Sequence, residues 1–490
     1  MKSGTMNQNQ KSMRHFLHTL SFICALVSAV LLTSPGVAAA EIQPVKYVFL
    51  FIGDGMSVAQ QQMGEEFVQK TENRGLRINA MPYQSLTTTH AAGDLFVTES
   101  AAAGTAIACG VKTGNGAIGQ DAEGNSVESV AELALKNGRK VGIISSVTIN
   151  HATPAAFYAH NASRSNEYEI GLDMVASGFD YFGGGGVARN NDRNAEKYRG
   201  DIYALAREAG YTVARSAADI RALRPGAGKV MAFSNSGAMS YAIDSSADEI
   251  RLPEFTKQAI ELLDNPNGFF LMVEGGKIDW ACHDNDGATA IRDIIEFDNA
   301  VSVAFDFAEK HPGEVLIVVT GDHETGMLSV SHSGTGYQVY LPLLANQKAS
   351  RGTLVTLTER FVNNGGENAT FENYQSFITE NTGLVFTEEG RWRAGNLNLT
   401  QNEMRELEND FNRTKTAIQE NASGRDRVAR TMVRMLNNKA GLTWGSGGHT
   451  GMPVITATWG NQAEPIAKAI RDNTDIAKQL KQAVGVLPSR

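Results

Sequence analysis

Four short apolar runs constrain the fold of this chain most strongly. They are rich in β-branched and aromatic residues, and segments with helix-like character lie between them. Short apolar runs that alternate with helices are typical of a mostly parallel sheet covered by helices on both faces. We therefore predict an α/β fold with a large, mostly parallel central sheet. The runs are residues 47–52, 141–146, 269–273 and 315–320.

Three of these runs end in residues that can hold a metal ion. Ligands in open α/β sheets bind at the carboxyl ends of the strands, so these residues are expected at one edge of the sheet. A single acidic residue or histidine at a strand end is more often structural, and it is the combination that favours a functional site. The residues are Asp54 after the first run, Glu274 after the third, and Asp322 with His323 after the fourth.

Further metal-ligand candidates lie between and beyond these runs. Asp279 and His283 are four residues apart, so a helical turn places both on one face, where they can share one metal ion. Glu274, at the strand end, would then face a different ion. His449 lies in the glycine-rich segment 444–451, which allows the backbone and an ion to approach closely.

Two other segments suggest phosphate chemistry. Ser100 stands just before three alanines, at an expected helix N-terminus. Serine there is more often a helix cap, but such a terminus also binds phosphate oxygens. The segment 150–164 adds the hydroxyl of Thr153, the imidazoles of His151 and His160, and the guanidinium of Arg164, which can bind two phosphate oxygens at once.

In this order, these segments resemble the alkaline phosphatase family. The similarity covers residues 47–164 and 269–323 and resumes at 445–451, whereas the middle of the chain and residues 330–440 match only loosely. The resemblance implies an alkaline phosphatase-like fold and the hydrolysis of phosphate monoesters to an alcohol and inorganic phosphate.

The resemblance also implies roles for the individual residues. Ser100 would be the nucleophile that is phosphorylated and then hydrolysed, and Arg164 would bind the phosphate. Two Zn²⁺ and one Mg²⁺ would support an in-line displacement, with the nitrogen-rich sites suited to zinc and the all-oxygen site to magnesium. The implied ligands are Asp279, His283 and His449 for one zinc, Asp54, Asp322 and His323 for the other, and Asp54, Thr153 and Glu274 for magnesium.

Three positions depart from the common pattern of the family. Glu99 stands where members commonly carry Asp, so any contact with Arg164 must accommodate one more methylene. His151 and Trp280 stand where some bacterial members have Asp and Lys, and this pairing resembles the cold-active marine type. We expect both side chains beside the magnesium ligands, where they would weaken the hold on that ion.

Other functions remain open from the residues alone. A phosphodiesterase of the same superfamily would prefer diesters, and a clamp on two non-bridging oxygens argues against it. A sulfatase needs a Cys or Ser followed by Pro and Arg, whereas Ser100 is followed by alanines. A non-catalytic periplasmic protein that binds metal or phosphate would need no nucleophile.

Charge limits the possible partners. The sequence has a net charge of −9, and without residues 1–40 it has 41 basic against 53 acidic residues, a net charge near −12. This sign disfavours a nucleic-acid partner. We expect small-molecule phosphate monoesters as substrates, and the resemblance favours a homodimer.

The N-terminus has the pattern of a signal peptide. Basic residues precede a short apolar run, which ends in the small residues 38–40. We expect cleavage after Ala40, export to the periplasm or medium, and no stable membrane anchor. Cys109 and Cys282 would remain after cleavage, and we expect both to be buried free thiols.

Residues 41–490 are expected to form a single catalytic domain. An insertion at about 330–440 would cap the site or form an interface, and it includes a predicted amphipathic helix at 425–436. The glycine run 183–186 is not followed by Gly-Lys-Ser/Thr, so we interpret it as a flexible turn rather than a phosphate-binding loop.

Overall fold

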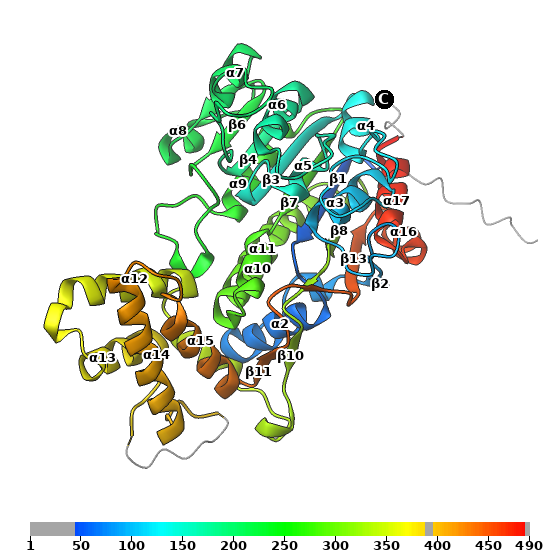
Figure 1. Cartoon of the computed structure of the whole chain (residues 1–490). Coiled ribbons are helices and arrows are strands. Elements are labelled where there is room, and N and C mark those ends of the chain that lie inside the picture. The colour runs from blue at the N-terminus through cyan, green and yellow to red at the C-terminus, as the bar shows by residue number, and fades with distance from the viewer. Residues whose placement is uncertain (1–44, 388–394, 486–490) are drawn as a thin grey trace, which may run out of the picture. The chain divides into compact units, whose positions relative to one another are not determined.

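The computed structural model describes residues 45–387 and 395–485 and is built on a central sheet flanked by helices (Figure 1). The predicted signal peptide, residues 1–40, lies outside the described residues. Among the helices that are described, none is both long enough and apolar enough to cross a membrane.

The sheet has nine strands in the order β2-β13-β8-β1-β7-β3-β4-β6-β5. Strand β13 is antiparallel to its two neighbours, and all other neighbouring pairs are parallel. The predicted fold class is therefore confirmed. The strands are β1 (Tyr47–Gly53), β2 (Tyr83–Thr87), β3 (Lys140–Thr148), β4 (Tyr181–Gly185), β5 (Thr212–Ala214), β6 (Val230–Phe233), β7 (Phe269–Glu274), β8 (Val315–Gly321) and β13 (Val454–Gly460).

The four apolar runs form β1, β3, β7 and β8, which lie side by side in the middle of the sheet. Alternate residues of β1 enter two separate cores: Phe49 and Phe51 belong to one and Leu50 and Ile52 to the other. A strand buried on both faces has no polar face, which explains why these runs are continuously apolar.

Helices cover both faces of the sheet. One face packs against α2 (Val58–Glu72), α8 (Ala217–Ala222), α9 (Leu252–Leu263), α10 (Lys277–His283) and α11 (Gly287–Ala308). The other packs against α3 (Ser100–Cys109), α4 (Val130–Lys136), α5 (Ala152–Ala155), α6 (Glu167–Ser177), α7 (Ile202–Glu208), α16 (Ala463–Ala469) and α17 (Asn473–Gly485). Short 3₁₀ helices are η1 (Ile78–Ala80), η2 (Ala242–Asp244), η3 (Ser333–Thr335), η4 (Leu341–Asn346) and η5 (Gly366–Asn368).

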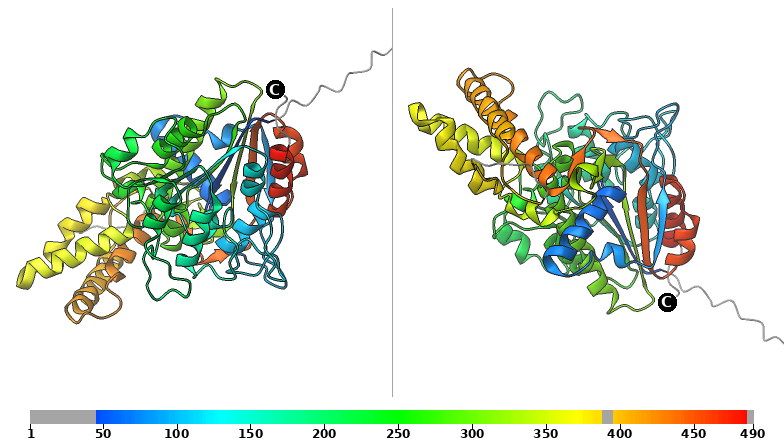
Figure 2. Two further views of the ribbon diagram at one scale, coloured as in Figure 1. Left: turned by 90° about the horizontal axis from the view of Figure 1, so that it is seen from above. Right: turned by 90° about the horizontal axis from the view of Figure 1, so that it is seen from below.

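The described residues of the polar region near 330–440 contain four α-helices with a hydrophobic core of their own. In both views of Figure 2 they form a separate group from the helices that flank the sheet. The predicted amphipathic helix is present as α15, and its apolar residues are buried. The four helices are α12 (Arg351–Gly365), α13 (Phe371–Thr382), α14 (Gln401–Gln419) and α15 (Arg427–Ala440).

The glycine run 183–186 is not a flexible turn, so that interpretation was wrong. Its first three residues are buried in β4, beside an irregularity in β3 between Ser145 and Thr148. A Cβ on Gly184 would lie 2.0 Å from the carbonyl oxygen of Ser145. The glycines are needed because the two backbones approach too closely for side chains.

Two small antiparallel pairs fold the C-terminal part of the chain back over the sheet edge. Strand β9 (Glu324–Thr325) pairs with β12 (His449–Thr450), and β10 (Leu328–Val330) pairs with β11 (Leu442–Trp444). Residue 449 thereby returns to the end of β8. Cys109 and Cys282 are both free and buried, as expected.

Candidate active site

The carboxyl ends of β1, β7 and β8 bring three acidic side chains together. Ile52 is in register with Glu274 on one side and with Thr320 on the other, so the three strands end at the same level. Glu274 is the last residue of β7, Asp54 and Asp322 directly follow β1 and β8, and all three side chains are fully buried. Buried carboxylates need compensating positive charge, and this edge of the sheet is where it must be supplied.

Asp54, Asp322 and His323 form one compact cluster. The Nε2 atom of His323 lies 3.4 Å from Asp54 Oδ1 and 3.3 Å from Asp322 Oδ2. The Oγ of Ser100 lies 3.3 Å from the same nitrogen. Two carboxylates and one imidazole thus converge on a point beside the serine, and one ligand atom from each lies within 4.8 Å of the others.

Asp279, His283 and His449 meet next to this cluster. Helix α10 places Asp279 and His283 one turn apart, with 3.3 Å between Oδ2 and Nε2. The Nε2 atom of His449 lies 3.1 Å from that of His283 and 3.6 Å from Asp279 Oδ1. Asp279, His449 and His323 each bring one ligand atom within 4.8 Å of the others, so the two clusters are contiguous.

A third group contains Asp54, Glu274, Thr153 and His151. The Thr153 hydroxyl donates to Asp54 Oδ2 at 3.3 Å. A ring nitrogen of His151 lies within 4.8 Å of carboxylate oxygens of Asp54 and Glu274, so this imidazole is closer to a possible ligand than the sequence suggested.

The electrostatics of the carboxylates fit the binding of divalent cations. Burial, followed by repulsion from Asp322, raises the pKa of Asp54 well above its usual range. Burial likewise raises the pKa of Asp322, and it raises that of Glu274 to about 7. In the described part of the chain, Asp54 Oδ1, Asp322 Oδ2 and Glu274 Oε1 are buried without a hydrogen-bond donor. Unpartnered carboxylate oxygens facing imidazole nitrogens are a donor set for metal ions.

Ser100 is the first residue of α3, and the cap is the residue before it. The carboxylate of Glu99 accepts hydrogen bonds from the backbone N–H groups of Ala101 and Ala102, at 3.0 and 2.9 Å. The hydroxyl of Ser100 is therefore not needed as a cap and points instead toward His323. Its side chain is buried at the positive end of the helix dipole, which favours an anion there.

Arg164 is held beside the serine by the same glutamate. Its Nη1 donates to a carboxylate oxygen of Glu99, and its backbone N–H donates to the carbonyl of Gly116 at 2.7 Å. Gly116 N–H donates to the other oxygen of Glu99 at 2.8 Å. The extra methylene of Glu99 is thus accommodated, because one side chain caps α3 and orients the guanidinium.

His151 and Trp280 lie together beside Arg164. Arg164 Nη2 lies 2.8 Å from His151 Nε2, and the rings of His151 and Trp280 meet edge to face at 6.1 Å between centroids. A guanidinium only donates, so Nε2 must accept and the proton of the neutral ring lies on Nδ1. Burial and Arg164 lower the pKa of His151 to about 4 and keep the ring neutral.

Sequence reasoning missed Ser145. Its hydroxyl donates to the carboxylate of Glu274, and the two residues are in register on neighbouring strands β3 and β7. The signal was present, because the predicted run 141–146 ends in two serines, of which Ser145 is the first.

Thr325 and Glu324 were also missed. The Thr325 hydroxyl donates to Asp279 Oδ1 at 2.5 Å and lies 3.3 Å from His323 Nδ1, so it touches a ligand candidate from each cluster. Glu324 accepts from the Thr450 hydroxyl and from Gln60 Nε2. These contacts fix the strand that carries His449. No spacing rule in the sequence points to them.

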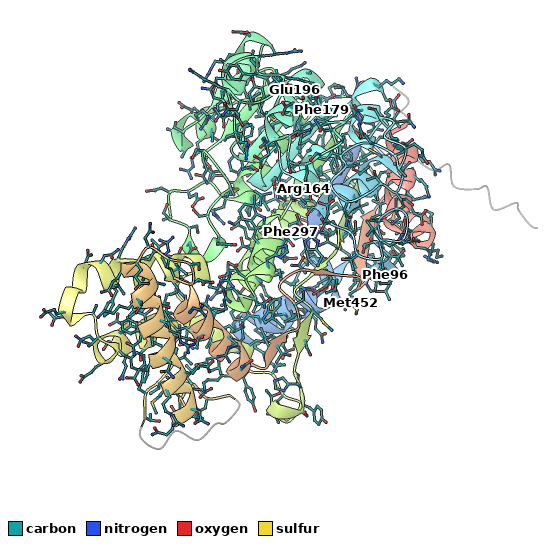
Figure 3. The ribbon with its side chains drawn as sticks, viewed as in Figure 1. Phe96, Arg164, Phe179, Glu196, Phe297 and Met452 are labelled. Carbon is teal, nitrogen blue, oxygen red and sulfur yellow. The ribbon has the colours of Figure 1, made fainter. Side chains whose placement is uncertain are left out.

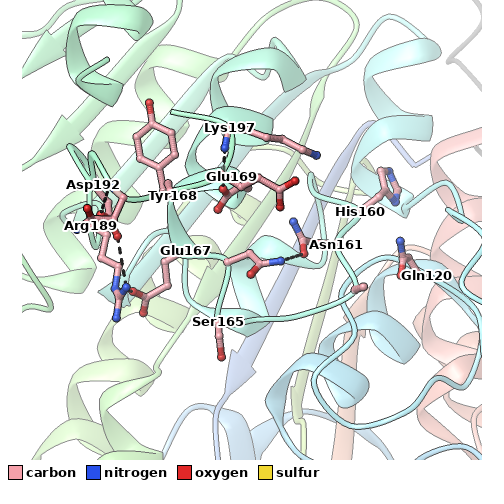
Figure 4. Close-up of a pocket in the computed structure, with 15 residues that line it drawn as sticks. Gln120, His160, Asn161, Ser165, Glu167, Tyr168, Glu169, Arg189, Asp192 and Lys197 are labelled. Atoms are coloured by element: carbon pink, nitrogen blue, oxygen red, sulfur yellow. Dashed lines mark hydrogen bonds and ion pairs between the residues drawn. The ribbon is translucent and has the colours of Figure 1, made fainter. Parts of the chain in front are cut away.

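A cavity of about 520 Å³ is lined mostly by residues of the segments 160–169 and 189–197 (Figure 4). Its walls include Tyr168, Glu169 and Lys197, together with His160, whose ring is bonded to Glu132 Oε1 and the carbonyl of Gly119. None of the residues that line it belongs to the metal-ligand clusters.

Comparison with known proteins points to one family. The family model described as alkaline phosphatase matches residues 45–486. The chain is 30% identical over 452 residues to alkaline phosphatase 3 of Bacillus subtilis, covering 90% of this chain and 89% of that protein.

Solved structures agree with this similarity. A cold-active alkaline phosphatase from a psychrophilic Shewanella superposes with a TM-score of 0.74 at 27% identity, covering 89% of this chain and 99% of that one. The alkaline phosphatase of Thermus thermophilus gives a TM-score of 0.74 at 25% identity, covering 92% and 95%.

Proposed function

Because the chain belongs to the alkaline phosphatase family and is thereby a metal-dependent phosphatase that hydrolyses phosphate monoesters, we propose that it acts through a phosphoserine at Ser100. One observation carries this proposal. The hydroxyl of Ser100 lies at a helix N-terminus, 3.3 Å from the His323 nitrogen at which two carboxylates converge.

The three groups of ligand candidates would hold the metal ions. Asp279, His283 and His449 suit one Zn²⁺, Asp54, Asp322 and His323 suit a second, and Asp54, Thr153 and Glu274 suit Mg²⁺. When bound, such ions lower the pKa values of the serine and of water and neutralise the charge of the phosphoryl group. The unpartnered carboxylate oxygens of Asp54, Asp322 and Glu274 support this assignment.

The residues of the chain account for the remaining chemistry. The guanidinium of Arg164 binds two phosphoryl oxygens, and Glu99 keeps it in place. Ser100 Oγ loses its proton and forms a bond to phosphorus, while the bond from phosphorus to the ester oxygen breaks and that oxygen takes up a proton from solvent, which balances the one lost by the serine, and leaves as the alcohol. Water then attacks the phosphoserine, and inorganic phosphate is released as the bond to Oγ breaks.

The direct test is metal-dependent hydrolysis. The purified chain should release p-nitrophenol from p-nitrophenyl phosphate, lose this activity on chelation, and act much more slowly on the bis(p-nitrophenyl) diester. A preference for the diester would identify a phosphodiesterase. Binding of phosphate without turnover would identify a non-catalytic protein.

Replacing Arg164 by Ala should weaken substrate and product binding together, because both share the clamped oxygens. We expect KM to rise and phosphate inhibition to weaken by roughly 1.5–3 kcal/mol each. Steady-state kinetics with phosphate as inhibitor measures both. Arg189→Ala, which removes an exposed arginine, is the matched control. Unchanged phosphate inhibition in Arg164→Ala would remove Arg164 from this role.

Replacing His151 by Asp should strengthen magnesium binding. Nδ1 of His151 carries a proton and Nε2 accepts from Arg164, so the ring has no lone pair left for a metal-bound water. A carboxylate supplies both charge and acceptors, and such outer contacts change metal affinity by roughly tenfold or more.

Titrating metal-stripped, zinc-reloaded protein with Mg²⁺ measures this difference. The native protein should be activated only at high magnesium and His151→Asp at lower concentrations, at some cost in turnover. Trp280→Phe, which keeps an aromatic ring, should follow the native curve. Coincident curves for native protein and His151→Asp would contradict the assignment.

We further propose that the substrates are small-molecule monoesters, with no nucleic-acid partner, and that the protein is an exported homodimer without a stable membrane anchor. The acidic charge of the chain supports the absence of a nucleic-acid partner, and the signal-peptide pattern supports export; the homodimer rests on the resemblance to the family. The mass of the mature protein tests cleavage after Ala40, and light scattering tests the dimer.

A further inference from the structure

One buried carboxylate joins two segments that carry different metal-ligand candidates. Glu324 follows His323 and is only 2% exposed. One of its oxygens accepts a hydrogen bond from Gln60 Nε2 at 2.7 Å, and the other accepts from the hydroxyl of Thr450. Thr450 follows His449 and is in register with Glu324 across the β9–β12 pair. Glu324 thus holds the segments of His323 and His449 together, although it is not itself among the ligand candidates.

Gln60 extends this contact to a third segment. It is buried near the start of α2, where its Oε1 accepts from the backbone N–H and the hydroxyl of Ser57, at 3.2 and 3.0 Å. Its Nε2 donates to the carbonyl oxygen of Thr325 at 2.8 Å as well as to Glu324. Ser57 stands three residues after Asp54. Three segments with ligand candidates therefore meet at two buried polar side chains.

The hydrogen-bond donors to Glu324 are all uncharged. Within the described chain its carboxylate accepts from an amide, a hydroxyl and the backbone N–H of Leu328, the last at 3.3 Å, and it forms no ion pair. A buried carboxylate without a counter-ion is a poor source of stability. Its presence at this junction points instead to a role in placing the segments that it joins.

His449 depends on this contact more than His323 does. His323 lies two residues beyond the central strand β8, and its Nδ1 is 3.3 Å from the Thr325 hydroxyl. His449 lies on β12, which has two residues and is held to the structure through its pairing with β9. Its ring has one further contact, 3.1 Å from Nδ1 to the carbonyl oxygen of Thr98. Loss of the Glu324 contacts should therefore release the segment of His449 first.

Given the proposed function, we propose that the three side chains of this network form a buried strut that positions His449 as a zinc ligand. The strut consists of Gln60, Glu324 and Thr450. Its members act through His449 and not on the substrate, so they are positioning residues. Groups that orient metal ligands set metal affinity, and their removal weakens it by roughly tenfold or more. The zinc assigned to the cluster around His323 should be affected much less.

The strut is tested by measuring zinc retention against a competing chelator. Glu324→Met keeps the length of the side chain but offers only a weakly accepting sulfur, so one zinc ion should bind roughly tenfold more weakly and the other within about twofold of native. Glu324→Gln keeps an acceptor for Gln60 and can donate to the Thr450 hydroxyl, so it should hold both ions within about threefold of native. Thr450→Val, which keeps the shape of the threonine, should weaken the same ion, and it carries the comparison if Glu324→Met does not fold.

His449→Ala identifies which ion is concerned. It removes a proposed ligand, so one zinc ion should be lost and the other retained. Because the strut acts through His449, adding Glu324→Met to His449→Ala should not weaken the remaining ion further. A further loss of that ion in the double variant would show that Glu324 acts on the other zinc site, and it would overturn the assignment to His449.

Asp298→Asn is the matched control. Asp298 is also a buried carboxylate, directly after Phe297 on α11 (Figure 3), and it accepts from the backbone N–H groups of Arg77 and Ile78 at 3.0 Å each. This variant should unfold at lower urea but keep both zinc ions. Equal weakening of both ions in Glu324→Met, native retention of both, or the same loss in Glu324→Gln would overturn the strut. Native protein that binds no zinc would refute the proposed metal sites themselves, and the strut with them.

Discussion

Replacing Ser100 by Ala should reduce turnover by roughly 1,000-fold or more, because the covalent route is lost together with its nucleophile. The variant should still bind its metal ions, because Ser100 is not among the ligand candidates. Its Oγ lies 3.3 Å from Nε2 of one of them, His323. Its fold should be unchanged, because Glu99 rather than Ser100 caps α3. Metal analysis and thermal melting measure these properties beside activity.

A trapping experiment identifies the nucleophile directly. Native protein incubated with labelled phosphate at acidic pH should carry the label on Ser100, and the alanine variant should carry none. Ser216→Ala, which removes the serine cap of α8, is the control and should keep full activity. Label on another residue, or near-native turnover in Ser100→Ala, would show that the reaction does not pass through this serine.

The central sheet could be predicted because the sequence pattern that specifies each strand lies within the strand and the residues that directly follow it. A strand buried on both faces must be apolar along its whole length, and its carboxyl end must be polar if it faces a ligand. The runs before Asp54, Glu274 and Asp322 satisfy both conditions, so their strands and their common edge followed from the sequence. The spacing of Asp279 and His283 fixed one helical turn in the same way.

The rest of the fold and of the site geometry depends on contacts between segments that are far apart in the chain. His449 reaches Asp279 only because β12 pairs with β9, and a two-residue pair leaves no periodic pattern. Thr325 contacts Asp279 across 46 positions and looks like an ordinary strand residue. The glycines of β4 were misinterpreted because the close approach of β3 that requires them is not encoded locally.

Removing the metal ions should make stability fall as the pH rises from about 5 to 8. Burial raises the pKa of Glu274 from 4.5 to about 7, and it raises those of Asp54 and Asp322 as well. In this range the folded metal-free protein holds carboxyl protons that the unfolded chain releases, and His283, whose pKa is raised to about 9 by Asp279, does the same, so these groups make the free energy of unfolding decrease with pH. Burial lowers the pKa values of His323 and His449, and these two imidazoles act in the opposite direction only below their ordinary pKa of 6.5. For Glu274 alone the loss amounts to roughly 3 kcal/mol. Bound dications keep the carboxylates ionised and remove this loss.

The measured quantity is the difference in unfolding free energy between metal-loaded and metal-stripped protein, obtained by urea denaturation at several pH values. Because groups elsewhere in the protein titrate alike in both forms, they cancel in this difference, which should therefore widen toward pH 8. Glu274→Gln removes one of the three raised groups, so its metal-stripped form should lose less stability over the same range. Parallel pH profiles for loaded and stripped native protein would mean that these carboxylates are not metal ligands, since only a bound cation distinguishes the two forms at this edge of the sheet.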